Sequence, residues 1–192
     1  MRKLSNLMLL AAFTSTLFYA MSYPYIYAET LKVVPSFYIG LEQILCCLGT
    51  AVFCFIWNKH SDKLFRFYRM ILWGEMIADI VLFSIVLITG NLNVYFLMNV
   101  IIYALITRNL ACGGTKMRAK VNPSEKSRER FDNNNNVVVS VAPLIGAGVA
   151  IAFPITLKIM FILALIGNCV DNVIYLYIYR KLLRKGKEKW NV

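Results

Sequence analysis

The sequence has little of the chemistry that most enzymes use. Its 192 residues include one histidine, His60, and only 16% of them are charged. No apolar segment carries a pair of metal ligands, a nucleophile beside a base, or a glycine-rich loop for phosphate. The five cysteines lie within or at the ends of apolar segments, in no pattern typical of disulfides or metal sites. We therefore expect no enzyme activity, no metal and no cofactor.

Apolar residues are abundant instead. They make up 59% of the chain, and its mean hydropathy is +0.60, well above that of a soluble domain. The formal charge of +11 would be compatible with nucleic-acid binding, but the basic residues form short blocks between long apolar segments. We expect the chain to bind no nucleic acid and to have the lipid bilayer as its partner.

A transmembrane helix needs about 20 apolar residues, and six segments meet this requirement. The sequence therefore predicts an all-α membrane protein with one domain, residues 1–180, and a basic tail, residues 181–192. The first segment follows Arg2 and Lys3 as a signal peptide would, but it is longer than a signal sequence needs, and we expect it to be retained. The predicted spans are residues 4–27, 35–57, 70–88, 92–112, 137–153 and 159–179.

The distribution of lysine and arginine predicts the orientation. An even number of spans returns both termini to one side of the membrane. Nearly all cationic residues fall in the N-terminal segment, the second and fourth loops and the tail, and short loops with such residues stay in the cytoplasm. We therefore expect a multi-pass protein of the plasma membrane with both termini cytoplasmic.

Carboxylates inside the predicted spans are costly, at about 2.5–3.5 kcal/mol each near the bilayer centre. Asp79 and Asp171 lie closest to the midplane. Each is expected either to carry a proton or bind a cationic substrate, or to be neutral and hydrogen-bonded between helices. For Glu42 and Glu75, which lie nearer the membrane surfaces, and for Asn99, interhelical hydrogen bonding is the simpler interpretation. Residues 133–136, four consecutive asparagines, are expected to cap the fifth helix.

The loop at residues 58–67 resembles a known family motif. Asp62, Lys63 and Arg66 match the Gly-x-x-x-Asp-(Arg/Lys)-x-Gly-(Arg/Lys) loop of the major facilitator superfamily, while Asn58 and Phe65 replace its two glycines. The resemblance implies that Asp62, Lys63 and Arg66 form a charged cytoplasmic latch.

Further along the chain, Arg108 is followed by two glycines and looks like the arginine of that family's fourth helix. Residues 123–130 are similar to its approach to the fifth helix. Residues 142–148 then resemble the Gly-Pro-x-x-Gly-Gly signature of its antiporters. The matching positions are Ala142, Pro143, Gly146 and Gly148.

The resemblance implies one six-helix half of a major facilitator fold, made of two nested three-helix inverted repeats. A complete pathway would then need a homodimer or a second six-helix half, and the chain would be a half-size, proton-coupled exporter of a small amphipathic or cationic compound. A non-transporting membrane protein with a binding or immunity role remains the alternative, as does a split or truncated half. The residues expected along the substrate and proton pathway are Glu42, Asp79, Asn99, Arg108 and Asp171.

Overall fold

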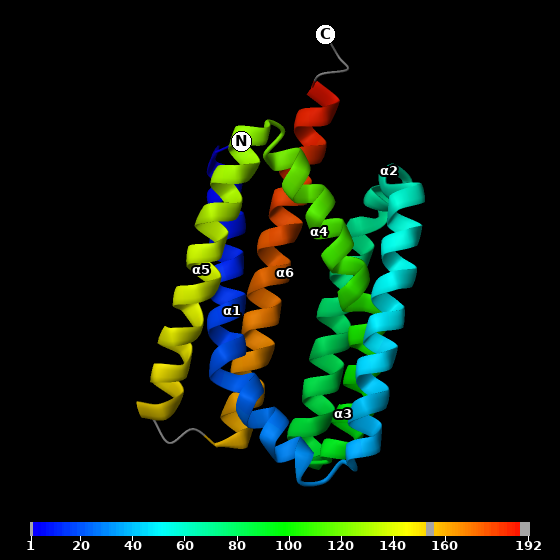
Figure 1. The fold of residues 1–192 in the computed structure, drawn as a ribbon, viewed down its shortest axis with the longest axis vertical. Helices are drawn as coiled ribbons and strands as arrows, with labels where there is room; N and C mark the ends of the chain where they lie inside the picture. The colour runs from blue at the N-terminus through cyan, green and yellow to red at the C-terminus, as the bar shows by residue number, and fades with distance from the viewer. Residues whose placement is uncertain (1, 153–155, 189–192) are drawn as a thin grey trace.

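The computed structural model describes residues 2–152 and 156–188, which are helical apart from short connections (Figure 1). Five helices are long and apolar enough to cross a membrane, if the continuous helical segment at residues 92–121 is counted as one helix. Phe153, the last residue of the fifth predicted span, and residues 189–192 of the tail lie outside the described residues. The elements are α1 (Arg2–Leu31), α2 (Ser36–Thr89), α3 (Leu92–Ile102), the π-helix η1 (Tyr103–Thr107), α4 (Arg108–Val121), α5 (Glu125–Ala152) and α6 (Leu157–Glu188).

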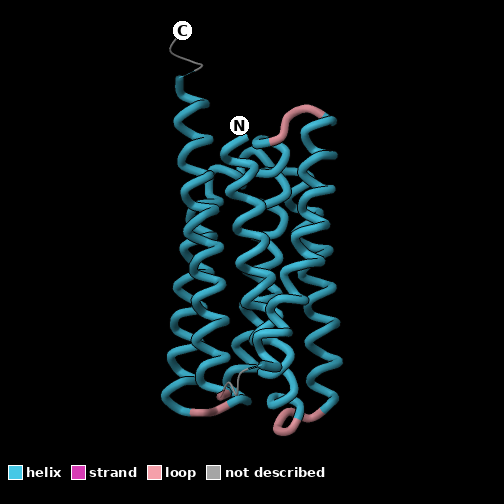
Figure 2. Tube along the Cα trace, turned by 90° about the vertical axis from the view of Figure 1, so that its left-hand side faces the viewer, coloured by secondary structure: helices cyan, strands magenta, loops and turns pink. Residues whose placement is uncertain are grey.

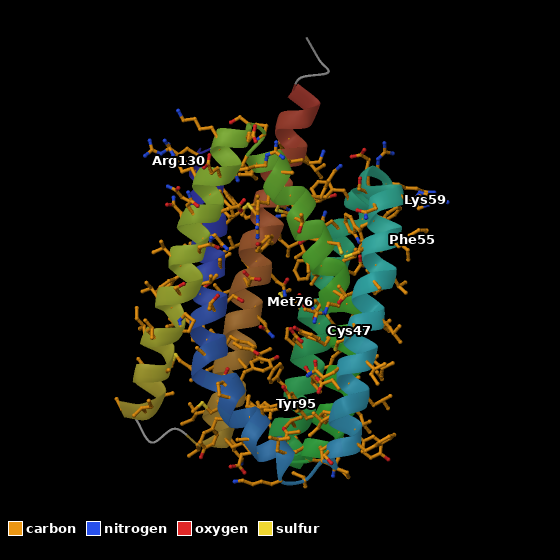
Figure 3. All side chains as sticks on the ribbon, in the orientation of Figure 1. Cys47, Phe55, Lys59, Met76, Tyr95 and Arg130 are labelled. Carbon is orange, nitrogen blue, oxygen red and sulfur yellow. The ribbon has the colours of Figure 1, made fainter. Side chains whose placement is uncertain are left out.

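Helix α2 differs from the expectation because it contains both the second and the third predicted spans. The expectation of six separate helices is wrong in this respect. His60 interrupts α2 with non-helical angles, φ −130° and ψ 27°, and the chain turns back there. Figure 3 shows Cys47 and Met76 in the middle of the bundle, with Lys59 near its end. The two arms of α2 thus form a helical hairpin.

An aromatic cluster stabilises this turn. The rings of Trp57 and Tyr68 lie 6.3 Å apart across it, whereas a straight helix would separate the two residues by about 16 Å. Phe65 stacks on Tyr68 at 5.8 Å, and Trp57 Nε1 donates a hydrogen bond of 2.5 Å to Asn109 on α4. The Tyr179 hydroxyl of α6 lies 2.9 Å from the carbonyl oxygens of Phe65 and Arg66 and donates to them.

We expect Tyr179→Phe to destabilise the protein by about 1 kcal/mol, because it removes the buried hydroxyl that donates from α6 to the backbone of the α2 turn. This corresponds to a fall of several degrees in the unfolding midpoint, measured by circular dichroism on the protein purified in detergent. Tyr177→Phe is the matched control, since Tyr177 is 48% exposed on the same helix. Equal midpoints for the two variants would contradict the role of Tyr179.

Two residues connect α2 to α3. Gly90 has a φ of 66°, a left-handed conformation that glycine adopts without strain, and its N–H donates to the Val86 carbonyl at 2.8 Å. The Asn91 side chain then accepts hydrogen bonds from the N–H groups of Asn93 and Val94. Gly90 therefore ends one helix and Asn91 begins the next.

Helix α5 begins earlier than expected. It starts at Glu125, where the Ser127 N–H donates to the Ser124 hydroxyl at 3.3 Å, and the four asparagines, residues 133–136, lie inside the helix. Their predicted capping role is therefore wrong. The fourth predicted span likewise continues helically to Val121, and α6 extends through the predicted basic tail as far as Glu188.

Helix α1 packs closely between α5 and α6, as both views of the bundle show (Figures 1 and 2). Ala142 is fully buried, and a Cβ on Gly146 would lie 2.6 Å from the Leu17 carbonyl oxygen. On the other side, a Cβ on Gly167 would lie 2.6 Å from the Phe18 Cβ. Small residues on α5 and α6 therefore allow α1 to approach both helices.

The two remaining residues of the antiporter-like motif have other surroundings. A Cβ on Gly148 would have no atom within 4 Å, so Gly148 does not contribute to this helix contact. Pro143 lies within α5, one residue after the buried Ala142, and is half-buried.

The start of α1, the α4–α5 connection, the turn of α2 and the end of α6 lie at one end of the bundle (Figure 1). Figure 3 places Lys59 and Arg130 near this end. Most basic residues therefore gather at the same end, which we call the basic end.

Candidate functional site

Two pairs of polar residues connect the second arm of α2 to α6. Glu75 and Asp79 are four residues apart on α2, and Asn168 and Asn172 are four apart on α6, so each pair lies on one helix face. Asn168 Nδ2 donates to Asp79 Oδ2 at 3.1 Å, and Asn172 Nδ2 donates to Glu75 Oε2 at 3.1 Å. The matching spacing makes two successive bridges between the helices.

Glu75 also contacts a third segment. Its Oε1 accepts a hydrogen bond of 2.9 Å from the hydroxyl of Thr107, the last residue of η1. Turns of π-helix often occur at functional sites, because the extra residue changes where the following side chains point. Glu75 therefore links α2, η1 and α6, a central position that its place in the sequence did not indicate.

Asp171 precedes Asn172 on α6, so it lies at about the level of Glu75. Both carboxylates line a cavity of about 300 Å³ that also contains Arg118 and Tyr175. Asp79 is only 6% exposed, one turn further from the basic end than Glu75. We call Glu75, Asp79 and Asp171 the carboxylate cluster, and the space beside it the carboxylate cavity.

A second cavity of about 330 Å³ lies between α1, the first arm of α2 and residues 95–108. Three of the predicted pathway residues, Glu42, Asn99 and Arg108, line it together. Its walls are rich in tyrosine, and we call it the tyrosine cavity. The tyrosines are Tyr19, Tyr23, Tyr27, Tyr95 and Tyr103.

Arg108 is held within the tyrosine cavity. Its guanidinium carbon lies 4.6 Å from the centre of the Tyr103 ring, a cation–π contact. Its Nε is buried and has no hydrogen-bond acceptor among the described residues. The cavity thus presents a cation and, in Glu42, a carboxylate to a bound molecule.

Thr107 and Arg108 connect the two cavities. Thr107 binds Glu75, which lines the carboxylate cavity, while the next residue, Arg108, lines the tyrosine cavity. Glu75 therefore lines one cavity and is hydrogen-bonded to the residue next to Arg108, which lines the other. The predicted pathway residues fall into two groups, Glu42, Asn99 and Arg108 on one side and Asp79 and Asp171 on the other.

The acidic residue of the predicted latch forms an ion pair with helix α4, a partner that the sequence did not indicate. Asp62 forms an ion pair of 3.1 Å with Lys116 on α4, and Lys116 also donates to the Ser61 hydroxyl at 3.1 Å. Lys63 and Arg66 are exposed, and no ion pair joins them to Asp62 within the described ranges.

The hydrogen bond and charge of Lys116 lower the pKa of the exposed Asp62 carboxyl below its ordinary value. A lowered pKa keeps the carboxyl charged at neutral pH, and its contribution to stability is lost only as the pH falls through that lowered value. Asp62 therefore stays charged, and able to pair with Lys116 on α4, throughout the physiological range.

Within residues 2–152 and 156–188, no three metal-ligating side chains come together, and His60 lies at the α2 turn. No family model, curated protein or solved structure matches this chain. The two cavities and the carboxylate cluster are therefore the observations that bear on function.

Proposed function

We propose that the chain is a plasma-membrane protein that crosses the bilayer six times, with α2 crossing twice. The length of α2 supports this, because its 54 residues would extend about 80 Å as one straight helix, against a hydrocarbon thickness of about 30 Å. Each arm alone is long enough for one crossing. The basic end would face the cytoplasm with both termini, as the positive-inside rule requires.

We further propose that the protein is a half-size secondary transporter that exports a small amphipathic or cationic compound in exchange for protons. The observation that carries this proposal is the carboxylate cluster in the interior of an apolar bundle, where Glu75 and Asp171 line one cavity and Glu75 contacts Thr107, the residue before Arg108 of the other. A charged carboxylate is costly there, so it must take up a proton or face a cation. A carboxylate that takes up a proton when the cation leaves would couple the two movements, which is the basis of antiport.

The tyrosine cavity is the proposed substrate site. Tyrosine faces attract organic cations, and Glu42 offers an opposite charge. The like charge of Arg108 would repel a cation bound beside it, so the cation is expected on the Glu42 side of the cavity. The carboxylate cavity would connect Glu75 and Asp171 to protons at the basic end. Binding of a proton at the cluster would weaken its attraction for the cation, which couples the two movements.

Alternating access in the major facilitator fold uses two six-helix halves, so we propose a homodimer or a complex with a second such half. The resemblance to the major facilitator superfamily supports this arrangement, since the two halves of those transporters face each other across the substrate path. The close packing of Ala142 and Gly146 on α1 also fits that resemblance.

The mass of the purified protein tests the pairing. Light scattering in detergent, with the detergent contribution subtracted, is expected to give twice the chain mass of 22.0 kDa for a homodimer. A monomer that stays monomeric after reconstitution in nanodiscs would contradict the homodimer and leave a separately encoded half as the partner to seek.

Ethidium accumulation in cells tests the transport function. Cells that express the protein are expected to retain several-fold less ethidium than cells without it, and Asp171→Asn should abolish this difference. Glu129→Gln is the matched control, because Glu129 is an exposed carboxylate on α5 that lines neither cavity and forms no ion pair with another described residue. Unchanged accumulation in every strain would contradict export and favour a non-transporting role in binding or immunity.

A further inference from the structure

A third cavity lies at the basic end, away from the carboxylate cluster. It has a volume of about 510 Å³ and is enclosed by the start of α1, the connection at residues 121–124 and the first turns of α5. Three cationic residues line it, Arg2, Lys126 and Arg130. We call it the basic cavity.

The charge of the basic cavity is uncompensated within the described part of the chain. No aspartate or glutamate lines it, and none of its three cations forms an ion pair there. The acidic residues of early α5 line a separate depression on another side of that helix, together with Arg128. The basic cavity therefore attracts anions.

Hydrogen-bond donors surround the same space. Hydroxyl and amide side chains from α1, from the connection before α5 and from α5 itself line the cavity. The 28-residue helix α5 begins at its edge, so the positive end of the helix dipole adds to the field. The polar uncharged lining residues are Ser5, Asn6, Asn122, Ser124, Ser127 and Asn134.

The depth of the cavity matches the headgroup region of a membrane. The apolar part of α5 begins at Val137, and Arg130 lies about 10 Å further along the helix axis, while Asn134 lies within about 5 Å. Headgroups occupy about 5–8 Å beyond the hydrocarbon on each side, and an arginine side chain can reach back into that layer. The buried side chains of Val121 and Phe131 form an apolar floor.

We propose that the basic cavity binds the phosphate of an anionic phospholipid headgroup. The three cations attract the negative charge of a phosphate diester, and arginine, lysine and amide N–H groups can donate hydrogen bonds to its oxygens. The volume admits the attached glycerol, and the apolar floor faces the part of the lipid nearest the acyl chains. Such a site would fix the ends of α1 and α5 to the cytoplasmic leaflet, and it does not depend on the transport function.

The test is a titration of the purified full-length protein in non-ionic detergent with dioctanoyl phosphatidylglycerol, with bound lipid counted by native mass spectrometry. We expect saturable binding of one lipid per chain, and at least tenfold weaker binding of dioctanoyl phosphatidylcholine, whose choline cancels the phosphate charge. Lys126→Gln/Arg130→Gln should weaken phosphatidylglycerol binding about thirtyfold, or about fivefold for each charge removed.

The control is Arg128→Gln/Arg184→Gln, which removes two exposed cations that do not line the cavity. It should change the affinity less than twofold. Equal losses in the two double variants, or no loss in either, would overturn the proposal. A competition experiment with glycerol phosphate identifies the source of the phosphate. If the lipid stays bound, the site belongs to the membrane. If glycerol phosphate at equal concentration displaces all of the lipid, the site belongs to a soluble phosphate ester.

Discussion

Glu75→Gln is expected to reduce ethidium export by more than tenfold, close to the background of cells without the protein. Glutamine keeps the size of the side chain and can still accept a hydrogen bond from Thr107, but it cannot bind or release a proton. Because Glu75 contacts η1 and α6 as well as lining the carboxylate cavity, its charge lies at the junction of the proposed pathway. Initial rates of ethidium efflux from preloaded cells measure the effect.

Two controls separate transport from folding. Glu29→Gln removes a carboxylate at the end of α1 that pairs with Lys32 and lies outside the cluster, so export should be unchanged. The glutamine amide at position 75 can keep its bond to Asn172 if that side chain turns its carbonyl oxygen toward it, so the fold should be destabilised by no more than about 1 kcal/mol. The second control is therefore the unfolding midpoint of the purified Glu75→Gln variant, measured alongside its efflux rate. A folded Glu75→Gln variant with full export would exclude the cluster from transport.

Gly146→Ala is expected to destabilise the bundle by about 1–3 kcal/mol, because the new methyl group would lie 2.6 Å from a backbone oxygen that cannot move alone. Gly148→Ala should do the opposite and stabilise the protein by up to about 1 kcal/mol. Its methyl group meets nothing within 4 Å, and alanine favours the helix over glycine. Thermal unfolding in detergent, followed by circular dichroism, measures both.

The opposite signs make this pair informative. If both substitutions raised the unfolding midpoint, α5 would not approach α1 as closely as the structure shows. If both lowered the midpoint, Gly148 would face a neighbour, such as a second copy of the chain. Close helix contacts of α5 would then not be limited to the face that carries Ala142 and Gly146.

Hydropathy predicted the positions of the apolar helical segments well, because a membrane requires long uninterrupted apolar helices and leaves few alternatives. It could not predict how far helices continue beyond the lipid. Ser124 begins α5 well before the apolar segment, so the asparagines that looked like caps lie inside the helix. The chain also turns back at His60, in the middle of α2. This turn depends on the packing of Trp57, Tyr68 and Tyr179 rather than on a local helix breaker such as proline or glycine.

The candidate site was predicted in part. The cost of a carboxylate in lipid identified Asp79 and Asp171, but the importance of Glu75 depends on how α2, η1 and α6 rotate against each other, and tertiary packing decides this. The shared four-residue spacing of Glu75 and Asp79 with Asn168 and Asn172 was the signal available in the sequence. The motif at residues 142–148 likewise predicted only part of the helix contact. Gly148 lies about 200° around the helix from Gly146, so it faces away from α1.

The most direct test of the central claim is proton movement in proteoliposomes that contain only this chain, with pyranine inside to report the internal pH. An imposed gradient of ethidium or tetraphenylphosphonium should drive protons in the opposite direction and shift the internal pH, and Glu75→Gln should abolish the shift. No shift with either cation, or a shift that persists in Glu75→Gln, would contradict proton-coupled export through the carboxylate cluster.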